Sequence, residues 1–280
     1  KDYKDHVEAS CGSVASTTII ELMRESATVE SFPFSRLATS DVGVISRNKH
    51  HITGLFEVDV TVAREQLRRM RRAGSSISFT SWFVKSVAQA IEEMPEVHGI
   101  LYGRRRRVVF DEVDVALMVE RVVENEPVPL PLVLSRCKKS LLGEIESEIQ
   151  AATTQSVEGA RDYQLGRRRS AFLMGFYYRL PQALRVFTMK WILRNPFRRK
   201  AAMGTTIVTS VAAGLRFPGW VIPRSMHNLV FGIGSVVRKP LVVREEVLPR
   251  DVLHLTVLLD HDVVDGAPAA RFISRLVKIL

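Results

Sequence analysis

The pattern of apolar and polar residues predicts a succession of short strands and helices, and it is clearest near the C-terminus. Apolar side chains fill one face of residues 252–259 and recur on the other, so a strand buried on both faces is predicted. A short polar turn follows. Gly266 then opens an amphipathic helix whose apolar residues recur at helical spacing: Ala269, Phe272, Ile273, Leu276 and Leu280.

The same patterns predict the earlier elements. Apolar and polar residues alternate over 55–60, which is typical of a strand. A polar, basic helix over 62–73 is broken by Gly74, and an apolar stripe predicts a buried helix over 78–94 that Pro95 ends. The elements expected after these are, in order, strand, loop, strand and helix over 113–150, a helix after Pro181, and a strand over 203–213.

Composition and charge add one unusual segment to this picture. The chain has 280 residues, of which 46% are hydrophobic and 25% charged, as in a globular domain. The formal net charge is +10, and residues 161–200 alone contain eleven Lys or Arg and a single acid, Asp162. The charge therefore belongs to one basic and aromatic stretch at about 156–203. A separate run, Arg104 to Arg107, is interpreted as a solvated hairpin turn.

Several interpretations of the basic stretch stay open. It could be a core or subunit-interface helix with a solvated basic face, which is the plainest interpretation. It could dock an acidic partner through residues 161–200, such as an acyl carrier or a lipoyl domain. A helix lying on a membrane surface ranks below these. Nucleic acid ranks last, because no recognition motif accompanies the charge.

Other features narrow the class of protein. Cys11 and Cys137 form neither a disulfide framework nor a metal-ligand cluster. No apolar run is long enough to span a membrane, and no secretory signal is visible. We therefore expect a cytoplasmic protein. Residues 1–31 are interpreted as an N-terminal arm, whose opening KDYKDH resembles an affinity-tag fragment.

The sharpest chemical signal is the spacing His-x-x-x-Asp-Gly formed by His261, Asp265 and Gly266. His261 comes directly after the buried strand, so a rigid core would hold it in place. Gly266 permits a turn that a side chain would block. Asp265 could cap the last helix or pair with a distant cation. A lone histidine in this position is often an ordinary strand-end residue. The sequence around His261 is what favours a catalytic role.

That neighbouring sequence resembles a known family. DHDVVDGAPAARF is similar to the active-site motif of the acyltransferase component of 2-oxoacid dehydrogenase complexes, a family that shares its fold with chloramphenicol acetyltransferase. SISFTSWFVKSVAQAIEEMPEVHG and the 113–150 region resemble its long helix and channel wall. The resemblance covers residues 32–280. It implies a single α/β (α+β) catalytic domain with a mixed, mostly antiparallel sheet flanked by helices, and a homotrimer with active sites between subunits.

The resemblance also implies roles for particular residues. His261 would be the general base, and Thr209 would hold the oxyanion where the family commonly has serine. Ser210, beside it, would point to the other face of the strand. Asp265 would pair with an arginine, for which Arg36 is the candidate and Arg24 and Arg47 are alternatives. The resemblance implies coenzyme A or acyl-CoA as a substrate. It implies neither a lipoyl group bound in this chain nor a metal.

One departure leaves alternatives open. Before its Val-Pro-Val the family usually has Gly-Leu, whereas this chain reads Glu126-Pro127-Val128-Pro129, so the identity of the donor is open. The main hypothesis is acyl transfer between coenzyme A and a lipoyl-type or carrier-type thiol. A catalytically inactive trimeric scaffold or carrier-protein binding module is the alternative from another class. A small-molecule O-acetyltransferase is a further alternative within enzymes.

Overall fold

A computed structural model describes residues 34–103, 105–123, 126–154, 176–211, 214–215 and 217–280. The chain divides into two units, Lys1–Pro33 and Phe34–Leu280, and every described residue belongs to the second. The predicted N-terminal arm, with Cys11 and Arg24, lies outside the described residues.

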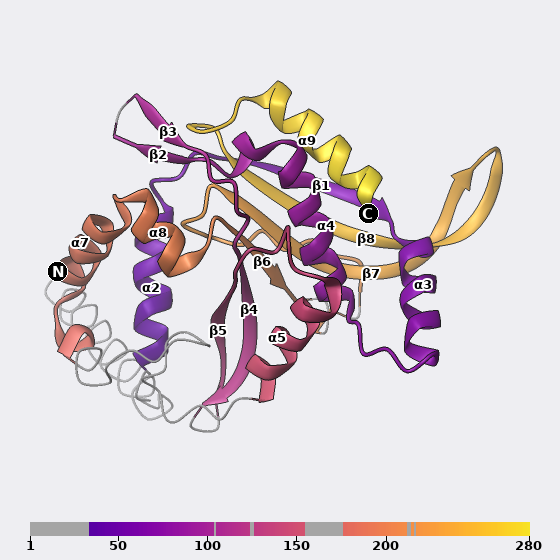
Figure 1. The fold of residues 1–280 in the computed structure, drawn as a ribbon, viewed down its shortest axis with the longest axis horizontal. Helices are drawn as coiled ribbons and strands as arrows, with labels where there is room; N and C mark the ends of the chain where they lie inside the picture. The colour runs from indigo at the N-terminus through magenta and orange to yellow at the C-terminus, as the bar shows by residue number, and fades with distance from the viewer. Residues whose placement is uncertain (1–33, 104, 124–125, 155–175, 212–213, 216) are drawn as a thin grey trace, which may run out of the picture. The chain divides into compact units, whose positions relative to one another are not determined.

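One six-stranded sheet organises the described unit (Figure 1). Its order is β1 (His51–Asp59), β8 (Glu246–Asp260), β7 (Leu229–Val243), β6 (Thr206–Ser210), β4 (Val115–Val123) and β5 (Glu126–Leu134). β6 runs parallel to both of its neighbours, and the other pairs are antiparallel. The prediction of a mixed, mostly antiparallel sheet is confirmed.

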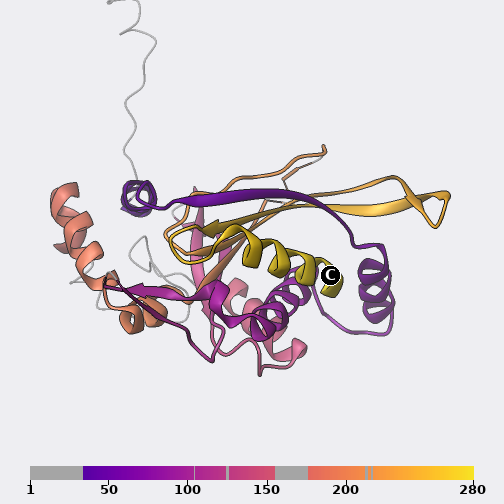
Figure 2. The same ribbon diagram turned by 90° about the horizontal axis from the view of Figure 1, so that it is seen from above.

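Helices cover one face of this sheet and close the core. Figure 2 shows α4 (Phe79–Glu93), α5 (Leu142–Thr154) and α9 (Gly266–Ile279) on the same side of the strands. Ser78 caps α4 by accepting a hydrogen bond from the amide of Ser81, as expected of an N-cap serine. The predicted stripe on α4 is core, and Phe83, Val87 and Ile91 are fully buried.

β8 is the centre of the core. Every residue from Asp251 to Asp260 is buried, which confirms the prediction of a strand buried on both faces. Phe231 on β7 packs against Phe83 and against Phe272 of α9. The end of β8 is therefore held between the helix layer and two neighbouring strands.

The arginine run before Val108 is only partly the solvated turn that was expected. β2 (Ile100–Tyr102) and β3 (Arg106–Val108) form a separate two-stranded sheet. Arg107 lies within β3, and its Nη1 donates a hydrogen bond to the backbone oxygen of Val263, at 2.8 Å. Arg107 therefore holds the turn after β8. The run of four arginines in the sequence does not predict this contact, because Val263 is far away in the chain.

Prolines shape the outer edge of the sheet. β5 is an edge strand, and Pro127, Pro129 and Pro131 occupy alternate positions along it. Alternate residues of an antiparallel strand direct their backbone groups to the same side, so the missing N–H groups of these prolines fall on the side away from β4. This is the placement that sheets tolerate for proline, and it explains the unusual Glu-Pro-Val-Pro sequence.

The described part of the basic stretch contains more than the one helix that was predicted after Pro181. Residues 155–175 lie outside the described part of the chain. After them come α7 (Gln182–Leu193) and α8 (Pro196–Met203), and α7 packs against α2 (Phe34–Ser46). A solvated basic face was one interpretation of this stretch, and Arg185 does not fit it. Arg185 is buried and paired with Asp41 of α2, at 2.8 Å from Nε to Oδ2.

Candidate functional site

The turn that joins β8 to α9 carries the His-x-x-x-Asp-Gly sequence. Val263 and Val264 are buried in the core, and their amides donate hydrogen bonds to the oxygen of Asp260, at 2.9 and 3.1 Å. The amide of His261 donates to the oxygen of His50, at 2.9 Å. The turn is thus anchored on both sides, while the side chain of His261 is exposed.

His261 differs from the other described histidines in the hydrogen bonding of its ring. The rings of His50, His51, His98, His227 and His254 all lie within hydrogen-bond distance of a partner. Among the described residues, the ring of His261 has none. An imidazole with no internal partner on a fixed turn is available to take a proton from a molecule that approaches it.

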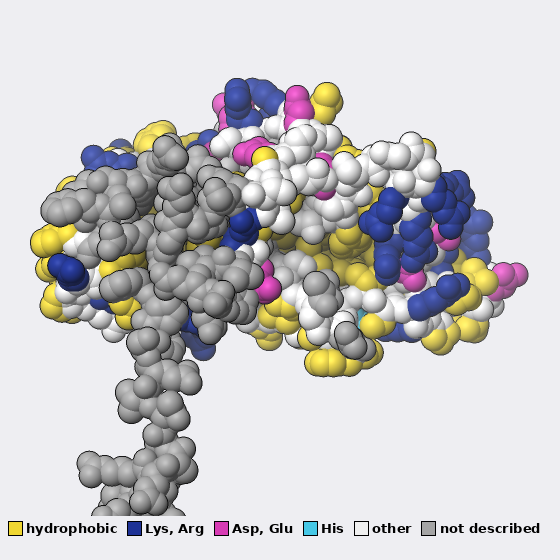
Figure 3. All heavy atoms as spheres, turned by 90° about the horizontal axis from the view of Figure 1, so that it is seen from below, with side chains coloured by type: hydrophobic (Ala, Val, Ile, Leu, Met, Phe, Trp, Pro, Cys, Tyr) yellow, Lys and Arg dark blue, Asp and Glu magenta, His cyan; other side chains and the backbone are white. Residues whose placement is uncertain are grey.

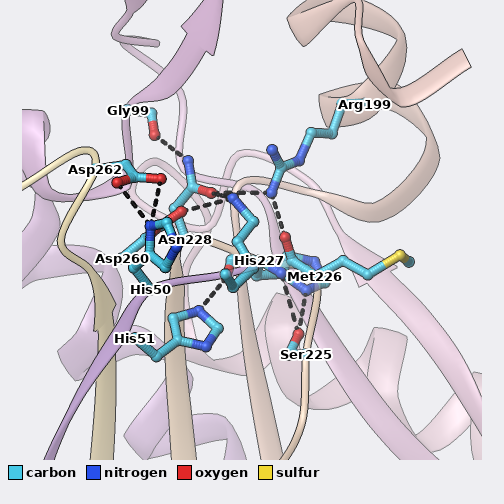
Figure 4. A network of polar contacts seen from close by, with 11 residues as sticks. His50, His51, Gly99, Arg199, Ser225, Met226, His227, Asn228, Asp260 and Asp262 are labelled. Carbon is cyan, nitrogen blue, oxygen red and sulfur yellow. Dashed lines mark hydrogen bonds and ion pairs between the residues drawn. The ribbon is translucent and has the colours of Figure 1, made fainter. Parts of the chain in front are cut away.

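A network of polar groups from five segments of the chain includes Asp260, the residue before His261 (Figure 4). Lys49 donates to Asp260 Oδ2 at 2.6 Å and to Asn228 Oδ1 at 2.5 Å. Arg199, from α8, donates to the same Asn228 oxygen at 3.1 Å. Asn228 in turn donates to the oxygen of Gly99, at 2.6 Å. The network therefore ties the end of β8 to β7, to α8 and to the segment before β1.

The charges in this network are not balanced. Asp260 is almost fully buried and has two cations near it, Lys49 and Arg199. Burial lowers the pKa of Lys49, and the charge of Arg199 lowers it further. Burial also lowers the pKa of Arg199 to about 10. The carboxylate of Asp260 is the anion that offsets these two cations, directly before His261 in the chain.

Two buried histidines support the surrounding core. His227 is held between the oxygen of Met203, at 2.7 Å, and the hydroxyl of Ser225, at 2.9 Å, and burial lowers its pKa to about 3. His98 lies between Thr205 and Phe110, and burial lowers its pKa to about 4. Both rings are therefore neutral near pH 7 and serve as fixed hydrogen-bonding groups.

None of this network was singled out from the sequence. Lys49, Arg199 and Asn228 meet residues that are far away in the chain, so no local spacing marks them. The exposed pair beside the network also joins the turn to a distant residue, 212 positions away in the chain. His50 Nδ1 lies 3.0 Å from Asp262 Oδ1, and that hydrogen bond raises the pKa of His50.

Thr209 lies on the face of the sheet opposite the helices. Val208 is fully buried in the core and Thr209 is half-buried, so the two point to opposite faces. Its registered neighbour is Gly232, which is aligned with Thr256 on β8. A Cβ on Gly232 would lie 2.7 Å from the oxygen of Val221, so the segment around Val221 covers this face.

Thr209 and His261 do not meet within one chain. His261 lies five positions past Thr256, about 16 Å along the strand at roughly 3.3 Å per residue. Thr209 is two strands away from β8, about 10 Å at the usual strand spacing. Together these place the two residues about 19 Å apart, far beyond the reach of a shared substrate atom.

Three other predicted site residues, Arg36, Asp265 and Gly266, behave differently from expectation. Arg36 is exposed on α2, and no ion pair joins it to Asp265 in the described part of the chain. α2 instead makes its buried ion pair through Asp41. Asp265 is the N-cap residue of α9 without a side-chain cap bond. The steric requirement expected for Gly266 is absent, since a Cβ there would meet nothing within 4 Å and its φ is outside the left-handed region.

Within the described residues, neither Cys137 nor a cluster of metal-ligating side chains forms a second reactive centre. Burial raises the pKa of the Cys137 thiol to about 12, so the thiol stays protonated and unreactive. The described residues contain no group of three or more His, Cys, Asp or Glu side chains that could hold a metal ion. Nor does any described helix combine the length and apolarity that crossing a membrane would require.

The fold and this turn define a class of domain. Residues 222–280 match the family model described as 2-oxoacid dehydrogenases acyltransferase (catalytic domain). The dihydrolipoamide acetyltransferase of Azotobacter vinelandii is 18% identical, with a TM-score of 0.65 over 91% of this chain and 92% of that one. A probable dihydrolipoamide acetyltransferase from Listeria monocytogenes gives 0.61 at 17% identity, over 91% and 94%. The chain has the fold of these acyltransferase domains.

Curated relatives agree with that class. The lipoamide acyltransferase component of the Bacillus subtilis branched-chain alpha-keto acid dehydrogenase complex is 23% identical over 82% of this chain and 46% of its own length. A probable succinyltransferase component from Schizosaccharomyces pombe is 23% identical over 75% and 38%. The chain spans less than half the length of these two relatives.

Proposed function

We propose that this chain transfers an acyl group between two thiols, one of them coenzyme A, with His261 as the general base. The observation that carries the proposal is the ring of His261, which has no hydrogen-bond partner within the described ranges and lies on a turn that the core holds rigidly. A base must be fixed in place and yet free to bind a proton. The resemblance in sequence and fold to acyltransferase domains supports the same reaction class.

Each step of the reaction can be written for groups of this chain. The neutral imidazole of His261 takes the proton of the attacking thiol, and the thiolate attacks the carbonyl carbon of the thioester. The Thr209 hydroxyl donates a hydrogen bond to the oxyanion that forms, and such a donor contributes about 10²–10³ in rate. Collapse of the tetrahedral intermediate breaks the bond to the leaving thiol, which recovers the proton from the imidazolium. No acyl-enzyme is needed.

A spacing in a related enzyme supports these three assignments. In the Azotobacter vinelandii enzyme, catalytic roles were investigated for a serine, for a histidine 52 positions after it, and for an asparagine four positions after the histidine. Thr209, His261 and Asp265 have the same two spacings in this chain. On this proposal, Asp265 occupies the asparagine position and holds the turn rather than carrying a proton.

The proposed site needs at least two copies of the chain. Because about 19 Å separate Thr209 from His261 in one copy, the histidine of one copy would face the threonine of the next. A closed ring of identical contacts satisfies this requirement, and the resemblance implies a ring of three. The substrate channel would then run between copies.

Thiol release from a panel of acyl-CoAs tests the proposal. Wild-type protein, His261→Ala and His50→Ala would be compared, with dihydrolipoamide and a simple alcohol as acceptors. We expect His261→Ala to lose at least about 10² in turnover, while His50→Ala, an adjacent exposed histidine, keeps most of it. Preference for the alcohol would favour an O-acetyltransferase. A His261→Ala variant with most of its activity intact would overturn the assignment of the base.

Thr209→Ala separates the oxyanion role from simple binding. Loss of a transition-state contact lowers kcat and leaves KM for acyl-CoA nearly unchanged. A change confined to KM would contradict the assigned role. Absence of turnover with every acyl-CoA and acceptor would favour the alternative, an inactive scaffold or carrier-binding module.

A further inference from the structure

α7 exposes an apolar face that the rest of the described chain does not cover. Leu184, Phe187 and Trp191 recur at helical spacing, and they are 45%, 65% and 63% exposed. Large apolar side chains on one helix face usually pack against a core. Here the face opposite to them, with Arg185 and Val186, is the buried one. We call Leu184, Phe187 and Trp191 the α7 stripe.

The helix that carries the exposed α7 stripe is firmly attached to the rest of the described chain. Arg185 makes a two-pronged ion pair with Asp41 of α2, with Nη2 at 3.1 Å from Oδ1 in addition to the Nε contact. Its Nη1 also donates to the oxygen of Leu180, at 2.6 Å. The hydroxyl of Tyr177 donates to the oxygen of Arg185, at 3.1 Å. These contacts fix the orientation of α7, and so they fix the outward direction of its stripe.

The surroundings of the stripe carry charge of one sign. Lys190, Arg194 and Arg198 are exposed beside it, and the guanidinium of Arg198 lies 5.7 Å from the centre of the Trp191 ring. Residues 176–203 contain seven Lys or Arg and no Asp or Glu. Arg and aromatic residues also recur where proteins meet, and a positive patch attracts an acidic protein, so a soluble acidic domain is the competing partner that the test must separate. A uniformly basic rim around Leu, Phe and Trp fits the phosphates and acyl chains of an anionic lipid surface.

We propose that α7 and α8 dock this protein on an anionic membrane surface. The α7 stripe enters the boundary between headgroups and acyl chains, and Lys190, Arg194 and Arg198 bind lipid phosphates. The helix lies in the plane of the surface and does not cross it. Because Arg185 and Asp41 already hold α7, binding needs no folding of this helix. The proposal does not depend on the acyl transfer proposed above.

A second basic surface provides the matched comparison. α3 (Thr61–Arg72) exposes Arg68, Arg69, Arg71 and Arg72, and Figure 3 shows Lys and Arg side chains gathered at that end of the molecule. Its exposed apolar residues, Val62 and Met70, include no aromatic ring. α3 therefore has the charge of the α7 surface without its aromatic stripe, and general attraction to anions would act on both.

Co-sedimentation of the full chain with vesicles tests the docking. We expect binding to vesicles with about 30% phosphatidylglycerol to exceed binding to pure phosphatidylcholine by at least about tenfold. Leu184→Ser/Phe187→Ser should lose at least about tenfold. Val242→Ser/Val247→Ser, at the 75% and 68% exposed tip of β7 and β8, should not. Lys190→Gln/Arg194→Gln should weaken binding more than Arg69→Gln/Arg71→Gln on α3.

Fluorescence locates the contact. Lipids brominated on their acyl chains should quench wild-type emission, and Trp191→Phe should lose most of that quenching while it still sediments, since Phe keeps the apolar contact. Trp82 and Trp220 remain as internal references. Each variant is checked for an unchanged melting temperature.

Three outcomes would overturn the proposal. The first is no binding to anionic vesicles, including the case in which a soluble acidic domain binds α7 instead. The second is an equal loss of binding for the α3 and α7 variants. The third is dissociation of the assembly by Leu184→Ser/Phe187→Ser in light scattering, which would make the stripe a contact between copies of this chain.

Discussion

Lys49 and Asp260 form a buried ion pair, 2.6 Å from Nζ to Oδ2, one residue before His261. The pair joins the segment before β1 to the end of β8, across 211 positions of sequence. Arg199 donates to the Asn228 oxygen that Lys49 also binds. The carboxylate of Asp260 therefore lies near two cations. The position of His261 thus depends on a charge balance around the residue before it.

Asp260→Asn should therefore destabilise the fold strongly. It removes the buried anion that acts on both Lys49 and Arg199, and removal of one partner from a buried pair costs roughly 3–5 kcal/mol. Urea unfolding measures the loss. The matched control is Glu93→Gln, which breaks an exposed pair with Arg275 and should have little effect. Equal stability of the two variants would show that the buried charges do not depend on Asp260.

Acid should destabilise the protein through His227 and His98. Their pKa values of about 3 and about 4 in the folded chain lie below the ordinary value of about 6.5. The unfolded chain therefore binds the protons first as the pH falls below 6.5. At pH 5 each histidine should lower the free energy of unfolding by about 2 kcal/mol, and this loss should disappear above about pH 6.5.

Melting temperatures between pH 7 and 4.5 measure this dependence, and His227→Gln should flatten it because glutamine does not titrate. His50 provides the opposite sign. Its pKa is raised by Asp262, so it stabilises the fold at low pH and its contribution is lost as the pH rises. His50→Gln should therefore make the acid loss slightly steeper. An unchanged profile for His227→Gln would contradict its neutral, buried state.

A side chain at Gly234 should displace the segment that covers the open face of the sheet. A Cβ there would lie 2.3 Å from the oxygen of Gly219 and 2.9 Å from the oxygen of His254. Both are backbone atoms, so Gly234→Ala should cost roughly 1–3 kcal/mol. Gly43→Ala in α2, where a Cβ meets nothing within 4 Å, should instead stabilise by about 0.5–1 kcal/mol. Thermal unfolding of the two variants gives the comparison.

Mixing inactive variants should restore activity if sites form between copies. His261→Ala and Thr209→Ala chains would be unfolded together in equal amounts and refolded. A site is intact when it takes its histidine from one variant and its threonine from the other, which happens at about a quarter of the sites in a ring assembled at random. We expect about a quarter of the wild-type rate. A rate no higher than the mean of the separate variants would place both residues in one chain.

The parts of the fold that follow from local sequence were predictable. The double-sided burial of 252–259, the stripe of Phe83, Val87 and Ile91, and the helix after Gly266 are all periodic patterns, and each is present. The His261 turn was also predictable, because a polar spacing directly after a buried strand is visible in the sequence. The physical reason is that near neighbours in the chain determine these features.

The parts that depend on distant partners were not predictable. Arg185 is one of several cations in a basic stretch, and only Asp41, 144 positions away, makes it a buried residue. The same holds for Arg199 and Lys49, which meet at Asn228. For α7 the sequence pattern did not predict which face of the helix is buried. Its apolar residues match the pattern of a core helix, yet the ion pair of Arg185 turns them outward. A helical pattern gives the two faces of a helix and does not say which one is buried.

The three prolines of β5 have a consequence for how copies of this chain can associate. At Pro127, Pro129 and Pro131 the outer edge of the sheet lacks the amide hydrogens that another strand would bind. A second molecule cannot extend the sheet on that side by adding a strand in register. Sideways growth into a continuous ribbon is therefore blocked at β5, and the copies must join through other surfaces. The same residues that alter the family sequence at this strand thus protect the folded protein against aggregation along its edge.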